Sequence, residues 1–340
     1  MYRRFVPGRL QNAVLTLGLL ASAFLVCGLT AAQQPRPLVV LKCHSDGVRC
    51  LAFSPDGKTI ASTGFDSTLR VWDVPTGKET ASIKTGKEYV TALGFSPDGK
   101  TLATASGGDG GVGLWDLPAR KRRTPEQELV QEIMSQVAFS PDGKSVALAS
   151  WCSGRLEVWD VTTCRRTAAL RKPEQSGGGP QTVAFTAGGR EVVAWGTDGG
   201  LERWEASGRK RPEKAGVGQK AHRGAITPDG KLLVTGEDDW DGGRFCVRVW
   251  DVAGRRERSS ITGRGGLYRL VVSRDGRAVA VSCDGGEVVV WDVATGKERL
   301  RLGGGSREGR VLALGPDGTV LATGGFEEKV INLWAVPEVK

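Results

Sequence analysis

Histidine is almost absent from this sequence, and its scarcity argues against the commonest hydrolase chemistry. His44 and His222 are the only two histidines among 340 residues, and no Gly-x-Ser-x-Gly motif occurs. A nucleophilic triad needs a histidine beside its serine or cysteine, and neither histidine has such a motif around it. We therefore expect no catalytic residues.

Motifs for metals and cofactors are also missing. No Cys-x-x-Cys pair occurs, which argues against a zinc ribbon or a haem attachment site. The most acidic stretch, 237–243, matches no complete calcium loop, so we interpret it as a solvated turn. We expect no metal ligand and no cofactor. The cysteines outside the N-terminal segment, for which buried thiols are favoured over disulfides, are Cys43, Cys50, Cys152, Cys164, Cys246 and Cys283.

One long apolar stretch, 13–32, follows a short segment that carries Arg3, Arg4 and Arg9. A signal peptide has an apolar core of about 7–15 residues, whereas about 20 apolar residues can cross a bilayer. We therefore predict that residues 1–34 form a signal peptide or an N-terminal membrane anchor. Both alternatives place the remainder outside the cytoplasm, with membrane contact only through residues 10–32 if the segment is uncleaved.

Glycine and tryptophan are abundant, with 49 and 10 residues, which is typical of many tight turns between short strands. Seven tryptophans recur at intervals of 43, 44, 45, 46, 41 and 43 residues: Trp72, Trp115, Trp159, Trp204, Trp250, Trp291 and Trp334. A turn motif, most often Ser-Pro-Asp-Gly, precedes each of them at 54–57, 96–99, 140–143, 186–189, 227–230, 273–276 and 315–318. Two markers that keep the same number and order predict seven repeated units.

Each unit has the pattern of four short strands. In the sixth unit the expected strands and turns are a strand at 267–272, a turn at 273–276, a strand at 277–282, a turn at 283–286, a strand at 287–291 and a fourth strand after 294–297. The strands are apolar on both faces, so both faces of each sheet must be covered by neighbouring sheets. Residues 35–340 are therefore predicted to form an all-β, seven-bladed β-propeller of four-stranded antiparallel blades.

The two ends of the chain are predicted to close the ring together. Only six residues follow Trp334, too few for a complete fourth strand in the last blade. Residues 38–41 are an apolar strand that belongs to no unit. We expect this N-terminal strand to complete the last blade, which would remove exposed sheet edges.

Over residues 38–340 the sequence resembles the WD-repeat family, in which Ser-Pro-Asp-Gly joins the first two strands of a blade and Trp-Asp ends the third. In the first repeat, the resemblance assigns His44, Ser62, Asp66 and Trp72 to the family's buried hydrogen-bond network. No other repeat has a histidine in that position, so we expect the other blades to rest on packing. His222 lies close to its turn and is expected in a strand.

The resemblance also implies partner binding at the end of the propeller that carries the turns between the second and third strands. Aromatic and arginine side chains carry much of the energy of protein interfaces, although each can instead serve strand-end packing. We place most weight on Trp151 and Trp240, which interrupt the repeat pattern inside turns. The candidate binding residues are Arg49, Phe65, Tyr89, Trp151, Trp240, Tyr268, Arg310 and Phe326.

Charge is distributed unevenly between the two ends of the predicted propeller. Basic runs such as 120–123 and 209–211 fall at one end, and acids such as Asp66 and Asp284 fall at the other. This distribution predicts a propeller with a basic rim opposite an acidic rim. Without the three N-terminal arginines the formal charge falls from +9 to +6, and no polybasic tail is present. Nucleic acid is therefore not expected as a partner.

The expected function is a non-catalytic protein–protein interaction scaffold or receptor that acts outside the cytoplasm, as a monomeric propeller, on another protein or peptide. The alternative is a propeller enzyme, or a small-ligand or metal binder that uses the central channel. A convergent pocket of carboxylates, lysine or metal on the axis would favour that alternative.

Overall fold

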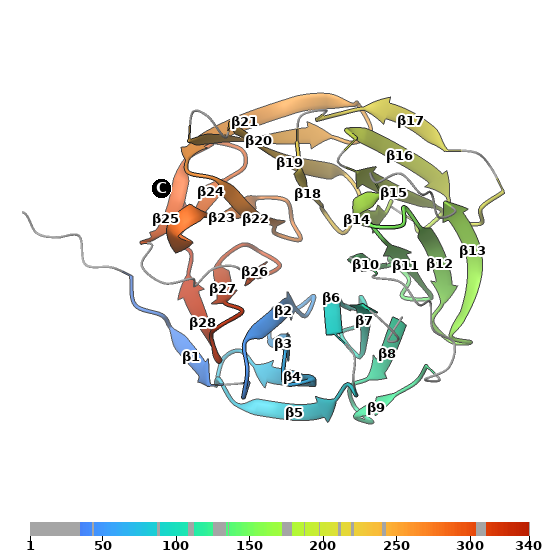
Figure 1. The fold of residues 1–340 in the computed structure, drawn as a ribbon, viewed down its shortest axis with the longest axis horizontal. Coiled ribbons are helices and arrows are strands. Elements are labelled where there is room, and N and C mark those ends of the chain that lie inside the picture. The colour runs from blue at the N-terminus through green and yellow to red at the C-terminus, as the bar shows by residue number, and fades with distance from the viewer. Residues whose placement is uncertain are drawn as a thin grey trace, which may run out of the picture. The chain divides into compact units, whose positions relative to one another are not determined.

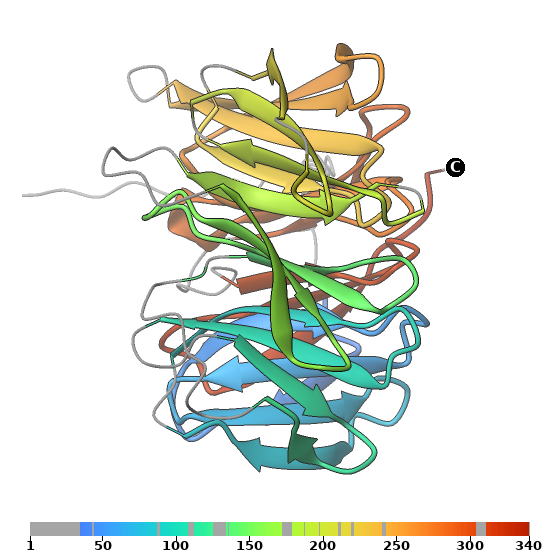
Figure 2. The same ribbon diagram turned by 90° about the vertical axis from the view of Figure 1, so that its right-hand side faces the viewer.

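The computed structural model describes residues 35–42, 44–86, 89–107, 112–124, 134, 136–171, 179–186, 188–196, 198–209, 212–218, 221–239, 243–303 and 311–339. This part of the chain forms seven four-stranded antiparallel sheets that follow one another around a ring (Figure 1). In the side view the strands run across the thickness of the ring, so their turns gather at two opposite ends (Figure 2). The predicted all-β, seven-bladed propeller is confirmed.

The strands of the first three blades, from the innermost outwards, are β2 (Val48–Phe53), β3 (Thr59–Gly64), β4 (Thr68–Asp73) and β5 (Glu79–Lys84); β6 (Tyr89–Phe95), β7 (Thr101–Gly107), β8 (Val112–Asp116) and β9 (Lys121–Arg122); and β10 (Gln136–Phe139), β11 (Ser145–Ala149), β12 (Leu156–Asp160) and β13 (Arg165–Arg171). The next two blades are β14 (Pro180–Phe185), β15 (Glu191–Gly196), β16 (Gly200–Glu205) and β17 (Glu213–Gly216); and β18 (Arg223–Ile226), β19 (Leu232–Asp239), β20 (Arg244–Asp251) and β21 (Arg256–Arg264). The last two are β22 (Leu267–Val272), β23 (Ala278–Cys283), β24 (Val288–Asp292) and β25 (Glu298–Leu302); and β26 (Val311–Leu314), β27 (Val320–Gly324), β28 (Val330–Ala335) and β1 (Val39–Lys42).

The sixth blade shows how the turn motif shapes a hairpin. Its first three strands agree with the predicted ones to within one residue at each end. Ser273 Oγ donates a hydrogen bond to Asp275 Oδ1 over 2.6 Å and accepts one from Ala278 N over 2.9 Å. Gly276 adopts a φ of 75°, which would strain any residue with a side chain. The second predicted turn contains a short 3-10 helix, η2 (Asp284–Gly286).

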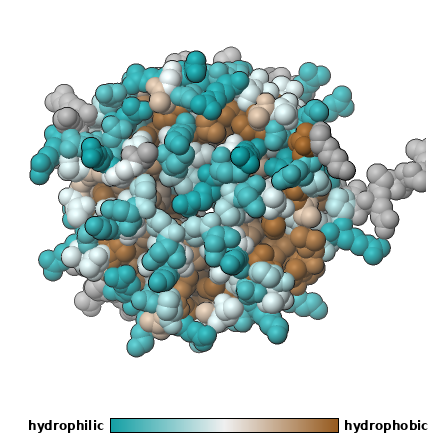
Figure 3. Space-filling model, turned by 180° about the vertical axis from the view of Figure 1, so that it is seen from behind, coloured by the Kyte–Doolittle hydropathy of each residue, from teal (hydrophilic) through white to brown (hydrophobic). Residues whose placement is uncertain are grey.

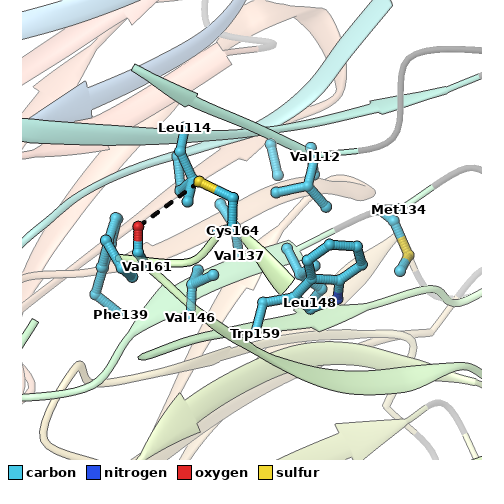
Figure 4. Packing of buried hydrophobic residues seen from close by; sticks show 13 residues of the cluster. Val112, Leu114, Met134, Val137, Phe139, Val146, Leu148, Trp159, Val161 and Cys164 are labelled. Atoms are coloured by element: carbon cyan, nitrogen blue, oxygen red, sulfur yellow. Dashed lines mark hydrogen bonds between the residues drawn. The ribbon is translucent and has the colours of Figure 1, made fainter. Parts of the chain in front are cut away.

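Neighbouring blades bury each other's apolar faces. Between the second and third blades, Leu114 of β8 packs with Val137 of β10, Val146 and Leu148 of β11, and Trp159 of β12 (Figure 4). Six further buried clusters fill the other six blade interfaces. On the face of the ring shown in Figure 3, apolar surface is visible only in patches between polar side chains. Mutual covering of the sheets therefore supplies the core, as predicted.

The N-terminal strand closes the ring. β1 pairs antiparallel with β28, with Val39 opposite Leu333 and Leu41 opposite Ile331, and Leu38 N donates to Leu333 O over 2.7 Å. The last blade is therefore built from both ends of the chain, as predicted.

Several sequence predictions fall on residues that the structure does not describe. The expected targeting segment, 1–34, and Cys43 are among them. In the described ranges, no helix is both long enough and apolar enough to span a membrane. None of the five described cysteines, Cys50, Cys152, Cys164, Cys246 and Cys283, forms a disulfide in the described part of the chain.

Two substitutions in β1 test how the ring closes. Leu41 is buried against the first blade, at 1% exposure, whereas Val40 on the same strand is 46% exposed. Leu41→Ala should lower the free energy of unfolding by about 2–5 kcal/mol because it leaves a cavity in a closed interface. Val40→Ala should cost less than about 1 kcal/mol, the range of strand propensity. Equal effects of the two substitutions in urea unfolding would contradict this closure, as would an unchanged melting temperature after deletion of residues 36–42.

Candidate functional site

The two ends of the propeller carry different turns. We call the end with the connections between blades and the turns between second and third strands the link end; 44–47 and 65–67 are examples from the first blade. The opposite, hairpin end carries the Ser-Pro-Asp-Gly motifs and the turns that follow the repeated tryptophans. The described candidate residues lie at the link end.

A buried chain of hydrogen bonds organises the link end of the first blade. Trp72 Nε1 donates to Ser62 Oγ over 3.1 Å, and Ser62 Oγ lies 2.9 Å from His44 Nε2. His44 Nδ1 lies 2.9 Å from Asp66 Oδ1. An indole N–H can only donate, so the serine hydroxyl proton is left to point at His44 Nε2. A neutral histidine then donates from Nδ1 to the aspartate. Each side chain in the series Trp72, Ser62, His44 and Asp66 thus donates a hydrogen bond to the next.

The surroundings of this hydrogen-bond network keep His44 neutral and Asp66 charged. Burial lowers the pKa of His44 below its ordinary value, and the hydrogen bond to Asp66 opposes this shift without cancelling it. Burial would raise the pKa of Asp66, but hydrogen bonds from Thr68, His44 and the Ser45 backbone lower it on balance. Gly64 makes room for the imidazole, because a Cβ there would lie 2.6 Å from His44 Nδ1.

The network also positions the neighbouring surface. Asp66 Oδ2 accepts a hydrogen bond from Ser45 N over 2.9 Å, which ties the turn at 65–67 to the connection at 44–47. Phe65 N donates to Gly47 O over 3.0 Å. Buried polar groups that satisfy one another hold a turn in one conformation. Phe65 is therefore presented from a rigid support.

Three of the candidate binding residues meet at the junction of the first and seventh blades. The rings of Phe65 and Phe326 make an edge contact with centroids 5.8 Å apart, and the Arg49 guanidinium lies 5.2 Å from the Phe65 centroid. Val48 N donates to Gly325 O over 2.9 Å. Gly47 packs so closely that a Cβ would lie 1.6 Å from Phe326 O. We name Arg49, Phe65 and Phe326 the aromatic cluster.

The other candidates are more dispersed. Tyr268 is the second residue of β22, and Trp151 lies in the turn between β11 and β12; both are exposed. Tyr89 begins β6, but its side chain is not described. Trp240 and Arg310 lie outside the described residues. The structure thus brings together Arg49, Phe65 and Phe326 and places Trp151 on a different blade.

Two further arginines at the link end belong to no motif that the sequence singled out. Arg223 is the first residue of β18, and Arg269 is the third residue of β22. Arg223 Nε donates to Tyr268 O over 3.0 Å, which links the fifth and sixth blades. An alignment of the first strands of all the repeats could have found Arg223 and Arg269, because both arginines occupy positions close to that of Arg49 in its repeat.

Hydrogen bonds also support the tryptophans of most other blades, so the prediction that these blades rest on packing is wrong for five of them. Hydroxyl acceptors on the second strand serve Trp115 with Thr104, Trp250 with Thr235 and Trp334 with Thr323. In the third and fourth blades the acceptors are buried glutamates two residues earlier, Glu157 for Trp159 and Glu202 for Trp204. The acceptor thus lies on the second strand in three of these blades and on the third strand in two, and the indole N–H has a hydrogen-bond partner in all five.

His222 also differs from its prediction. It lies at a bend directly before β18 and not within a strand. Its Nε2 lies 3.0 Å from Asp238 Oδ2, and Asp238 Oδ1 accepts a hydrogen bond from Leu267 N over 2.9 Å. This buried carboxylate therefore connects the fifth blade to the sixth. Within the described ranges, no group of three or more His, Cys, Asp or Glu side chains is arranged to hold a metal ion.

The ring of seven blades makes the chain a β-propeller, and its repeated turns and His44 network are similar to those of WD-repeat proteins. The family model described as WD domain, G-beta repeat matches residues 35–73 and 77–116. The chain is 26% identical over 311 residues to guanine nucleotide-binding protein subunit beta-1 of Nicotiana tabacum, covering 85% of this chain and 69% of that protein. It is 25% identical over 314 residues to the subunit beta of Oryza sativa subsp. japonica, covering 87% and 71%. A shorter match, 43% identical over 56 residues, is to ribosome biogenesis protein BOP1 of Rattus norvegicus, covering 16% of this chain and 8% of that protein.

Removing the central hydroxyl of the network should be costly. Ser62→Ala leaves both Trp72 and His44 without their buried partner, which should lower the free energy of unfolding by about 1–3 kcal/mol. Ser282 provides a matched control, because it is equally buried and its hydroxyl has no hydrogen-bond partner in the described part of the chain. Ser282→Ala should be close to neutral in the same denaturant titration. If both variants lose the same stability, the network does not support the blade.

Acidification should weaken the native state through His44. Because burial lowers the pKa of folded His44 below the ordinary 6.5, the unfolded chain takes up its proton at higher pH. The stabilisation is therefore complete above about pH 6.5 and is lost as the pH falls towards the lower pKa of the folded state. The free energy of unfolding of His44→Gln should fall less than that of the wild type between about pH 7.5 and about pH 5. His222→Gln controls for the loss of one histidine, and equal pH slopes for wild type and His44→Gln would refute the assignment.

Proposed function

We propose that this protein is a non-catalytic scaffold that binds another protein or peptide at the link end of its propeller. The observation that carries the proposal is the position of its exposed aromatic residues. Trp151, Tyr268 and Phe326 are 53%, 44% and 43% exposed, and they are three of the five exposed large apolar side chains in the described part of the chain. All three lie at the link end.

Exposed aromatic residues on a rigid support are suited to binding. Each buries a large area at little cost in conformational entropy, and such residues often contribute about 2 kcal/mol or more at interfaces. The hydrogen bonds around Gly47, Phe65 and Asp66 hold the aromatic cluster in place before any partner arrives. A preorganised surface loses less entropy on association.

The relatives support the same role. Two of them are named as subunits of a guanine nucleotide-binding protein, so proteins of similar sequence belong to assemblies. For this chain we infer a comparable role in holding a partner, without inferring that partner's identity from theirs.

The proposed location is outside the cytoplasm. Its support is the order of features at the N-terminus, where three arginines precede the apolar stretch 13–32. That order is typical of export signals and membrane anchors with the positive charge inside.

A capture experiment tests the binding face. Full-length protein would be cross-linked in its native cells and purified, with partners identified by mass spectrometry. The triple variant Trp151→Ala, Tyr268→Ala and Phe326→Ala should lose the captured partner, because three interface residues at about 2 kcal/mol each weaken binding by several powers of ten.

The matched control is Leu38→Ala with Val40→Ala, which removes similarly exposed apolar side chains from β1. This control should retain the partner, and both proteins should melt like the wild type. Loss of the partner from the β1 control but not from the triple variant would place binding elsewhere and reject the proposal.

A further inference from the structure

The charged residues of the seven innermost strands are all of one sign. These strands surround the centre of the ring in Figure 1, and each contacts the next. Arginine is the only charged residue type in them, and it occurs at Arg49, Arg223 and Arg269. No aspartate or glutamate lies on any innermost strand. The inner wall of the propeller is therefore basic.

The three arginines lie at the same end of that wall. Each is among the first three residues of its strand, and each of these strands starts at the link end. Arg269 interacts electrostatically with the Cys50 thiol on β2 and with Arg223 on β18. Residues from the first, fifth and sixth blades thus lie near one another at the link end of the axis, and we name Arg49, Arg223 and Arg269 the basic mouth.

One arginine of the basic mouth carries positive charge without an ion pair in the described part of the chain. Arg269 is exposed, and its guanidinium makes no hydrogen bond there. Burial lowers the pKa of Arg223, the positive charge of Arg269 lowers it further, and Asp238 opposes both effects. Like charges held close together favour the arrival of an anion.

The inner turns at the opposite end of the axis carry charges of both signs. Six of the seven inner hairpin turns carry an aspartate at the hairpin end: Asp56, Asp98, Asp142, Asp229, Asp275 and Asp317. Exposed basic residues lie in or directly beside five of the same turns: Lys58, Lys100, Lys144, Lys231, Arg274 and Arg277. Hydrogen bonds from Ser54, Ser96 and Ser140 hold the pKa of Asp56, Asp98 and Asp142 below the ordinary value, so these three stay charged. The inner turns of the hairpin end therefore lack the single-sign charge of the innermost strands.

Aromatic side chains flank the basic mouth. Arg49 lies over the ring of Phe65, which contacts Phe326. On the other side, Tyr268 is exposed and directly precedes Arg269. A ligand at the mouth can therefore place its carboxylates against the arginines and an apolar side chain against the aromatic surface.

We propose that the partner is recognised through a short acidic peptide segment with an apolar anchor residue, which binds across the basic mouth and the aromatic cluster. This inference rests on the proposed use of the link end as the binding face. Carboxylates suit arginine because guanidinium groups donate paired hydrogen bonds. A long polyanion such as nucleic acid fits less well, because Asp198, Asp284 and Glu327 are exposed on the surrounding turns and would repel a continuous row of phosphates.

The test starts from an unbiased set of ligands. Random dodecapeptides displayed on phage would be selected on the full-length protein in detergent, and enriched peptides would be synthesised with a fluorescent label. Fluorescence anisotropy then gives Kd for the wild type and for Arg269→Gln. Arg274→Gln is the matched control, since Arg274 is an exposed arginine of the same blade at the hairpin end.

The proposal expects enriched peptides that are rich in Asp and Glu and contain an aromatic or aliphatic residue. Their Kd should rise at least about tenfold with Arg269→Gln, which corresponds to a lost charge-assisted contact, and should stay unchanged with Arg274→Gln. Binding should also weaken as salt is raised.

Other outcomes distinguish a failure of the proposed acidic ligand from a failure of the proposed binding face. Peptides without an acidic excess, lost with Phe326→Ala but unaffected by Arg269→Gln, would overturn the acidic ligand and leave the binding face intact. No enriched peptide, or peptides indifferent to both substitutions, would overturn both. A dodecamer of deoxythymidine that binds more tightly than every enriched peptide would replace the peptide by nucleic acid.

Discussion

The structure depends on one constraint, which is that each blade is apolar on both faces and is stable only between two neighbours. Seven buried clusters fill the seven interfaces, and none of them belongs to a single sheet. Burial of apolar surface stabilises the fold in proportion to the area removed from water. A ring satisfies every blade at once, whereas an open stack leaves two apolar faces exposed. Closure by β1 against β28 is therefore required for the whole core.

This constraint acts differently on the two ends of the propeller. At the hairpin end, the inner turns lie against one another; a Cβ on Gly57 would lie 3.2 Å from Pro316, and one on Gly143 would lie 3.4 Å from Pro97. Repetition of nearly the same four residues follows from that crowding. At the link end the turns differ in length and composition. The hairpin between β19 and β20 extends further along the chain than its counterparts, and the exposed aromatic residues occur in this more varied half. Specific binding is more readily encoded where packing leaves such freedom.

Polar groups inside the blades show how a repeated fold tolerates sequence change. The tryptophan that ends the third strand needs an acceptor for its indole N–H, because a buried donor without a partner costs about 1–3 kcal/mol. Ser62 and three threonines supply it from the second strand, and Glu157 and Glu202 supply it from the third strand itself. Only in the first blade is the acceptor extended through His44 to Asp66. That blade adjoins the chain closure and supports the aromatic cluster, so the most elaborate network lies beside the surface where we propose binding.

Local sequence determined the number of blades, their strands, the turn chemistry and the closing strand, because these depend on periodicity, on glycine and proline conformation and on counting residues. The four members of the His44 network could also be named in advance, since the first repeat keeps them at the family spacing. Tertiary structure alone decided which residues from distant repeats face one another. Arg49, Arg223 and Arg269 occupy similar positions in their repeats but are far apart in the chain, and only the ring brings them to the same end of the axis. The meeting of Phe65 with Phe326 depends in the same way on the contact between the first and last blades. Such juxtapositions follow from how the sheets pack around an axis, and no local pattern of residues records that geometry.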